Sequence, residues 1–133
     1  MKKAFIATPM SAFSKEEYAE LSKTIKEIQL ESDYEIFAEI TTVTLDTFLP
    51  PSEALDNDLA AIRQSDVFIA IYPKQVLTSL FLELGYAMAN KKEIFIFVKD
   101  KKALPFLLLD HPGVIEYKDN KQLNEFIMGV LSV

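Results

Sequence analysis

Two uninterrupted apolar segments constrain the fold of this chain more than any other feature of its sequence. They are Val67-Phe68-Ile69-Ala70-Ile71-Tyr72 and Ile94-Phe95-Ile96-Phe97-Val98, and both have the length of a β-strand. A strand that is apolar at every position has to be covered on both faces. This pattern is typical of a parallel sheet enclosed between two layers of helices.

Helical patterns alternate with strand patterns along the chain. The expected strands span 4–8, 34–40, 66–72, 93–98 and 114–117, and the expected helices span 14–30, 52–64, 79–90 and 119–131. Ser14 with Glu17 forms a capping-box pattern, and Asp119 is a typical cap for the last helix. We therefore expect a single α/β domain over 1–133. It should be a flavodoxin-like three-layer sandwich with five parallel strands in the order 2-1-3-4-5.

The composition excludes several kinds of site. There is no cysteine and only one histidine, so disulfides, thiolate chemistry and a zinc site of several histidines are excluded within one chain. We expect no metal and no cofactor. The net charge of −6 argues against binding nucleic acid. With neither a signal peptide nor an apolar run that could cross a bilayer, we expect a cytoplasmic protein without membrane association.

The expected strand order places a ligand crevice beyond the carboxyl ends of the first and third strands. The residues that follow these strands and would line the crevice are Thr8, Pro9, Met10, Ser11, Tyr72, Pro73 and Lys74. The first loop carries no glycine-rich motif, so neither a dinucleotide site nor a P-loop is predicted. Hydroxyls such as those of Ser11 and Ser79 could hold a phosphate, although such hydroxyls commonly act only as helix caps.

Two carboxylates are candidates for chemistry in this crevice. Glu83 lies in the first turns of a helix, at the edge of its apolar stripe, and Asp58 lies near the inner stripe of the preceding helix. Such a carboxylate can attack a sugar carbon or, with a raised pKa, act as a general acid. The alternative is that each is an ordinary solvated helix residue. Asp66 begins its strand at the opposite end of the sheet and is interpreted as structural.

Three stretches resemble a known family. The run Glu83-Leu84-Gly85-Tyr86-Ala87 follows the strand Ser65-Asp66-Val67-Phe68, and the chain opens with Ala4-Phe5-Ile6-Ala7-Thr8-Pro9-Met10. This arrangement is similar to the nucleoside 2-deoxyribosyltransferase family. Its relatives include deoxynucleoside 5′-monophosphate N-glycosidases and, more distantly, Toll/interleukin-receptor-type domains that cleave NAD. The resemblance covers nearly the whole chain in layout and is most specific between residues 65 and 97.

The resemblance implies roles for individual residues. Glu83 would be the nucleophile that attacks the anomeric carbon and expels the base, and Asp58 would help to hold the sugar or base. Ser79 resembles a hydroxyl that the NAD-cleaving members carry in this loop, and Thr8, Pro9 and Met10 would contact base or sugar. The substrate would be a nucleoside, a nucleotide or an NAD-like molecule. A neighbouring subunit often completes the site in these families, so we expect a homo-oligomer.

One departure from the family pattern leaves other functions open. Relatives commonly have glycine just before the nucleophile, whereas this chain has Leu80-Phe81-Leu82, and this bulk is expected to narrow the pocket. That would favour the NAD-cleaving branch or a non-catalytic nucleotide-binding or signalling module over an ordinary glycosidase. A third possibility is an oligomerising scaffold that uses the apolar segments 48–51 or 106–109.

Overall fold

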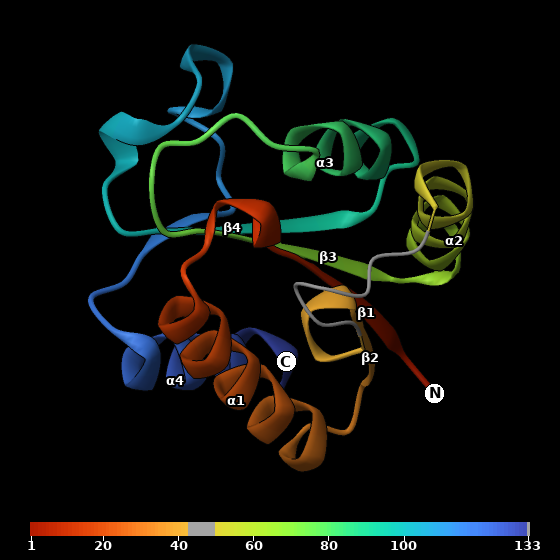
Figure 1. The fold of residues 1–133 in the computed structure, drawn as a ribbon, viewed down its shortest axis with the longest axis horizontal. Helices are drawn as coiled ribbons and strands as arrows, with labels where there is room; N and C mark the ends of the chain where they lie inside the picture. The colour runs from red at the N-terminus through yellow and green to blue at the C-terminus, as the bar shows by residue number, and fades with distance from the viewer. Residues whose placement is uncertain (43–49, 133) are drawn as a thin grey trace.

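The computed structural model describes residues 1–42 and 50–132, and it contains a five-stranded parallel sheet (Figure 1). Its strands are β1 Lys3–Ala7, β2 Glu35–Ala38, β3 Val67–Tyr72, β4 Glu93–Val98 and β5 Val114–Glu116. They are arranged in the order β2-β1-β3-β4-β5, and every neighbouring pair is parallel. The predicted fold class and strand order are therefore confirmed.

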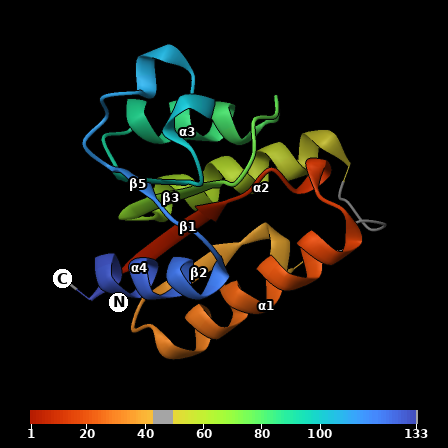
Figure 2. The same cartoon turned by 90° about the vertical axis from the view of Figure 1, so that its left-hand side faces the viewer.

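The helices cover both faces of the sheet. Their bounds are α1 Lys15–Glu31, α2 Pro51–Gln64, α3 Leu80–Ala89 and α4 Asn120–Leu131. The pair α1 and α4 lies on one face and the pair α2 and α3 lies on the other (Figure 2). Among the described residues, no helix is long and apolar enough to cross a membrane.

Alternating side chains of the central strands fill two apolar cores. Ile6 of β1 packs against the α1 and α4 layer, whereas Phe5 packs against the α2 and α3 layer. The Phe5 ring stacks between those of Phe37 and Phe68, at centroid distances of 5.2 and 5.5 Å. All six residues of β3 are buried. Burial on both faces explains why the sequence of this strand contains no polar position.

Polar contacts at the element ends agree with the sequence patterns. The Glu17 N–H donates to the Ser14 hydroxyl at 3.2 Å, and the Ser14 N–H donates to the Glu17 carboxylate at 2.9 Å. The Asp119 carboxylate accepts from the Gln122 N–H and caps α4. Asp66 accepts a hydrogen bond from the Lys3 N–H at 3.0 Å and joins the amino ends of β1 and β3. Its structural role is confirmed.

Two local expectations were wrong. The second strand ends at Ala38, not at residue 40, because the chain turns there into a 3₁₀ helix over Glu39–Thr41. The Tyr18 and Ser22 hydroxyls of α1 both donate to the Ile40 carbonyl, at 2.8 and 3.3 Å, and hold this turn. The helical spacing of Leu55, Leu59 and Ile62 predicts that all three point inward, but Leu55 is 44% exposed. The long connection between the expected strand 34–40 and the expected helix 52–64 could form a lid, but it lies largely in residues 43–49, outside the described residues.

Gly113 is predicted to be intolerant of any side chain. It is buried at the start of β5, and a methyl group there would clash with the backbone carbonyl of Ile94 in β4. We expect Gly113→Ala to lower the free energy of unfolding by about 1–3 kcal/mol in urea denaturation.

Gly129→Ala is the matched control. Gly129 lies in α4, and a methyl group there would meet no atom within 4 Å. Helix propensity should then raise the free energy of unfolding by about 0.5–1 kcal/mol. Equal effects of the two substitutions would contradict the assignment of Gly113 to a close contact between strands.

Candidate active site

A cavity of about 380 Å³ opens at the carboxyl ends of β1 and β3. One wall is the loop after β1, which contributes Thr8, Pro9, Met10 and Ser11. The β1 strand ends at Ala7, and Met10 to Ala12 form a 3₁₀ helix that turns this loop over the sheet edge. The cavity therefore lies at the edge of the sheet where open α/β folds bind their ligands, and it includes the predicted first-loop residues. Tyr72, Pro73 and Lys74, which were expected to line it after the third strand, are not among its lining residues.

Helices α2 and α3 form the opposite wall. The cavity is lined there by Ala54, Leu55 and Asp58 of α2, and by Thr78, Ser79, Leu82 and Glu83 at the start of α3. The Glu83 N–H donates to the Ser79 carbonyl at 3.1 Å, which closes the first turn of α3. The structure thus brings together Asp58, Ser79 and Glu83 with all four candidates from the first loop.

Three carboxyl groups converge in this cavity. Glu39 enters from the turn after β2, Asp58 from α2 and Glu83 from α3. One oxygen from each group lies within 4.8 Å of the others. Glu83 is only 7% exposed, so it is not the solvated helix residue of the alternative interpretation. Three such groups cannot all be ionised at this spacing without strong mutual repulsion.

The pKa of each of these groups is raised, and burial is the largest cause in every case. Loss of solvent, followed by the nearby Asp58 carboxylate, raises the pKa of Glu83 to about 9. The same causes raise the pKa of Glu39 to about 7. Burial also raises the pKa of Asp58, although its hydrogen bonds to Glu83 and Glu39 act in the opposite direction.

Hydrogen bonds connect the three carboxyls of the cavity. The hydrogen bonds with Asp58 raise the pKa of both glutamates and lower that of Asp58, so Asp58 is the carboxyl that the two glutamates share. A hard cation could also bridge oxygens at this spacing.

Glu39 is the functional candidate that sequence reasoning missed. The pattern of residues 34–40 placed it inside a strand, where its side chain would belong to one face of the sheet. A usable signal was present, because Glu39 is an acidic residue directly after the carboxyl end of a strand next to β1. Carboxyl ends of parallel strands meet at one sheet edge, where ligands bind.

Tyr72, a predicted substrate-binding residue, lies outside this cavity. Its hydroxyl donates to the Val76 carbonyl at 3.0 Å and accepts from the Val76 N–H at 2.9 Å. Its ring meets that of Phe81 edge to face at 5.0 Å. Tyr72 and Phe81 line a separate, largely apolar cavity bounded by Leu104 and Pro105. The contacts of Tyr72 thus hold the loop that leads into α3.

The expected narrowing of the pocket by three bulky residues was wrong. Leu80 is 1% exposed and packs into the core beneath α3, and Phe81 faces Tyr72. Only Leu82 lines the acidic cavity, and it is 59% exposed. Helical geometry explains the result, because three consecutive helix residues point about 100° apart and cannot all face one cavity.

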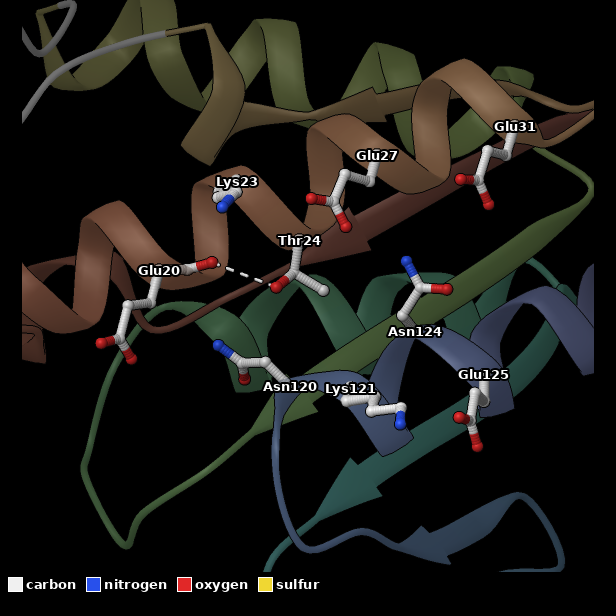
Figure 3. Close-up of a pocket in the computed structure, with 9 residues that line it drawn as sticks. All are labelled: Glu20, Lys23, Thr24, Glu27, Glu31, Asn120, Lys121, Asn124 and Glu125. Atoms are coloured by element: carbon white, nitrogen blue, oxygen red, sulfur yellow. Dashed lines mark hydrogen bonds between the residues drawn. The ribbon is translucent and has the colours of Figure 1, made fainter.

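A second, larger hollow lies between α1 and α4 and has a volume of about 540 Å³ (Figure 3). Its walls are polar side chains such as Lys23, Glu27, Lys121 and Asn124. The figure shows the Thr24 hydroxyl, which donates to the Glu20 carbonyl at 3.1 Å. This groove runs along the outer surfaces of two helices, away from the carboxyl ends of the strands, so we assign the candidate active site to the acidic cavity.

The raised pKa values predict how stability depends on pH. A carboxyl whose pKa is near 9 when folded and 4.5 when unfolded stabilises the fold fully below pH 4.5. That stabilisation is lost as the pH rises toward 9, because the folded state retains a proton that the unfolded state releases. We expect Glu83→Gln to resemble the wild type at pH 5 and to be more stable at pH 8, by on the order of 2 kcal/mol.

Urea denaturation at several pH values would measure this difference. Glu125→Gln, at an exposed position of α4, is the matched control and should follow the wild type at every pH. A stability difference between Glu83→Gln and wild type that does not change with pH would contradict the buried, protonated state of Glu83.

Comparisons with known proteins agree with this geometry. The solved structure of a CMP N-glycosidase from Clostridium botulinum is similar, with a TM-score of 0.68 and 24% sequence identity. That of a 2-deoxyribosyltransferase from Leishmania mexicana is also similar, with a TM-score of 0.68 and 20% sequence identity. The alignments cover 95% and 96% of this chain, and 98% and 97% of those chains. At these identities the likeness shows the fold alone. A de novo designed Rossmann 2x3 fold protein is also similar, at TM-score 0.61 and 12% identity, over 99% of this chain and 90% of that chain.

Sequence comparison identifies the family. No curated protein sequence gives a significant match. A family model described as nucleoside 2-deoxyribosyltransferase, however, matches residues 4–126. The matched range includes all five strands except the first residue of β1, and it includes every described residue of the acidic cavity. The resemblance seen in the sequence is therefore confirmed, and this chain belongs to the nucleoside 2-deoxyribosyltransferase family.

Proposed function

We propose that this protein cleaves the N-glycosidic bond of a nucleoside, with Glu83 as the nucleophile and Asp58 as its proton acceptor. The observation that carries this proposal is the convergence of three carboxyls in a cavity at the sheet's carboxyl edge, in a chain of this family. A volume of about 380 Å³ falls within the roughly 300–1,000 Å³ typical of small-molecule sites.

The existing hydrogen bond between Glu83 and Asp58 supplies the activation step. Glu83 passes its proton to Asp58 and becomes a carboxylate, which the amino end of α3 stabilises. A Glu83 oxygen then bonds to C1′ of the sugar, and the C1′–N bond breaks with its electron pair passing to the base. Water or the nitrogen of a second base attacks C1′ next, and the Glu83 carboxylate is released.

The close spacing of the carboxyls supports attack by Glu83 over attack by a free water molecule. Glycosidases that form a covalent intermediate hold their two carboxyls about 5–5.5 Å apart, whereas those that use water directly leave roughly 6.5–9.5 Å. The oxygens of this cluster lie within 4.8 Å. This close spacing supports a glycosyl ester on Glu83 as the intermediate.

The charge of the cavity favours an unphosphorylated substrate. None of the described residues that line it is Lys, Arg or His, and three of them are acidic. Lys74, in the loop after β3, is not among the lining residues and is paired with Glu17 at 2.9 Å. In sequence, residues 43–49 also contain no basic side chain. A phosphate would meet carboxyls without a cation to neutralise it, so we favour a nucleoside over a nucleotide or NAD.

Release of free base from a panel of nucleosides, nucleotides and NAD tests the proposal. We expect turnover of at least one nucleoside, and we expect Glu83→Gln to reduce kcat by at least about 1,000-fold because the attacking oxygen is removed. A 2-deoxy-2-fluoro nucleoside should leave a sugar attached to Glu83, which is measurable as a mass increase of the intact protein.

Glu93→Gln is the matched control for this experiment. Glu93 is exposed and begins β4, at the opposite end of the sheet from the cavity. Its substitution should leave turnover unchanged. Full activity of Glu83→Gln would disprove the nucleophile assignment, and absence of turnover across the panel would disprove the reaction.

We also propose that the protein is a homo-oligomer that assembles through the segment after β4. Phe106 and Leu107 are 84% and 90% exposed, beside the apolar cavity of Tyr72 and Phe81. Apolar side chains this exposed commonly mark an interface. Sedimentation equilibrium should give a mass above that of one chain for the wild type, and the double variant Phe106→Asp, Leu107→Asp should sediment as a monomer. A monomeric wild type at high concentration would refute this.

A further inference from the structure

Glu39 is placed in the cavity by contacts that do not depend on the other two carboxyls. The turn that carries it is held by two hydroxyls of α1, those of Tyr18 and Ser22, which donate to the neighbouring Ile40 carbonyl. The Ala38 carbonyl accepts from the Thr41 hydroxyl at 2.9 Å and tightens the same turn. The Glu39 side chain is thus presented to the cavity by a fixed backbone, as a substrate-contacting residue requires.

The reaction leaves one task without a group to perform it. The departing base carries the electron pair of the broken bond and must be neutralised by a proton. Asp58 holds the proton that it receives from Glu83 and has to return it when Glu83 is released, so we assign Asp58 to the nucleophile. Of the described residues that line the cavity, Glu39 is the remaining carboxyl, and the hydroxyls of Thr8, Ser11, Thr78 and Ser79 are far weaker acids.

We propose that Glu39 is the general acid that protonates the departing base, and this rests on the proposed function of Glu83. As C1′–N breaks, its electron pair passes to the base nitrogen, which takes the proton of the Glu39 carboxyl. The base leaves neutral, and Glu39 is left as a carboxylate. When water attacks the sugar ester, Glu39 takes the proton of that water, while Glu83 departs as a carboxylate. Asp58 then returns to Glu83 the proton that it took, and the site regains its starting protonation.

The surroundings of Glu39 suit this role. Among the described residues, Asp58 from α2, Glu83 from α3 and Tyr18 from α1 interact electrostatically with Glu39, and none of these three is basic. Burial and Asp58 raise the pKa of Glu39 to about 7, near the value at which a carboxyl can both give and take a proton at neutral pH.

Paired substrates that differ in their need for a proton test this assignment. 2′-Deoxyguanosine needs protonation for its base to leave, whereas 7-methyl-2′-deoxyguanosine carries a positive base that departs neutral without it. We expect Glu39→Gln to reduce cleavage of the first substrate by about 100-fold or more and that of the second by less than about 3-fold. Glu35→Gln, at an exposed position of β2, should match the wild type on both.

A pH profile extends the test to whichever panel nucleoside the wild type cleaves fastest. In the wild type, kcat/KM should decrease at high pH as Glu39 ionises. In Glu39→Gln this decrease at high pH, the alkaline limb of the profile, should be absent. Glu39→Ala, made in parallel, should regain activity with added formate, which a merely structural role would not allow.

The outcomes separate this proposal from the one on which it rests. The role of Glu39 would be overturned if Glu39→Gln lost the same activity on both guanine substrates or lost none on either. It would also be overturned if kcat/KM of Glu39→Gln still decreased at high pH as in the wild type. In each case the turnover of the wild type and its dependence on Glu83 would stand. A wild type that releases no base from any panel member would overturn both.

Discussion

The complete burial of β3 is the constraint on which the rest of this structure depends. All six of its side chains are enclosed, so helices must cover both faces of the sheet. Covering both faces with short connections requires parallel strands joined by helical crossovers. All strands then end at the same edge, and this is why residues far apart in the chain, such as Thr8, Glu39 and Glu83, reach one cavity.

The cavity itself opposes the stability of the fold. Three carboxyls meet in a space where their charges cannot all be solvated, and each is held by a separate element. Hydrogen bonds to Asp58 connect the three groups, and this arrangement would bring together the nucleophile and the acid that we propose. Active sites commonly place ionisable groups where they destabilise the fold, because catalytic groups need pKa values that differ from those in water.

Tyr72 and Phe81 show how a residue can serve the site without lining it. From the sequence, Tyr72 was predicted to contact the substrate and Phe81 was predicted to narrow the pocket. Instead, their rings pack together, and the Tyr72 hydroxyl closes the turn at Val76. This packing turns Phe81 away from the acidic cavity, so that of Leu80, Phe81 and Leu82 only Leu82 lines it.

The sequence by itself determined the fold class, the strand order and the pairing of Asp58 with Glu83 at one sheet edge. Apolar periodicity and caps such as Ser14 act over a few residues, so they can be read directly. Only the tertiary structure decided that β2 ends at Ala38, that Glu39 enters the cavity and that Leu80 leaves it. Those outcomes depend on contacts between distant elements, above all the α1 hydroxyls that bind the Ile40 carbonyl, and no local pattern encodes such contacts.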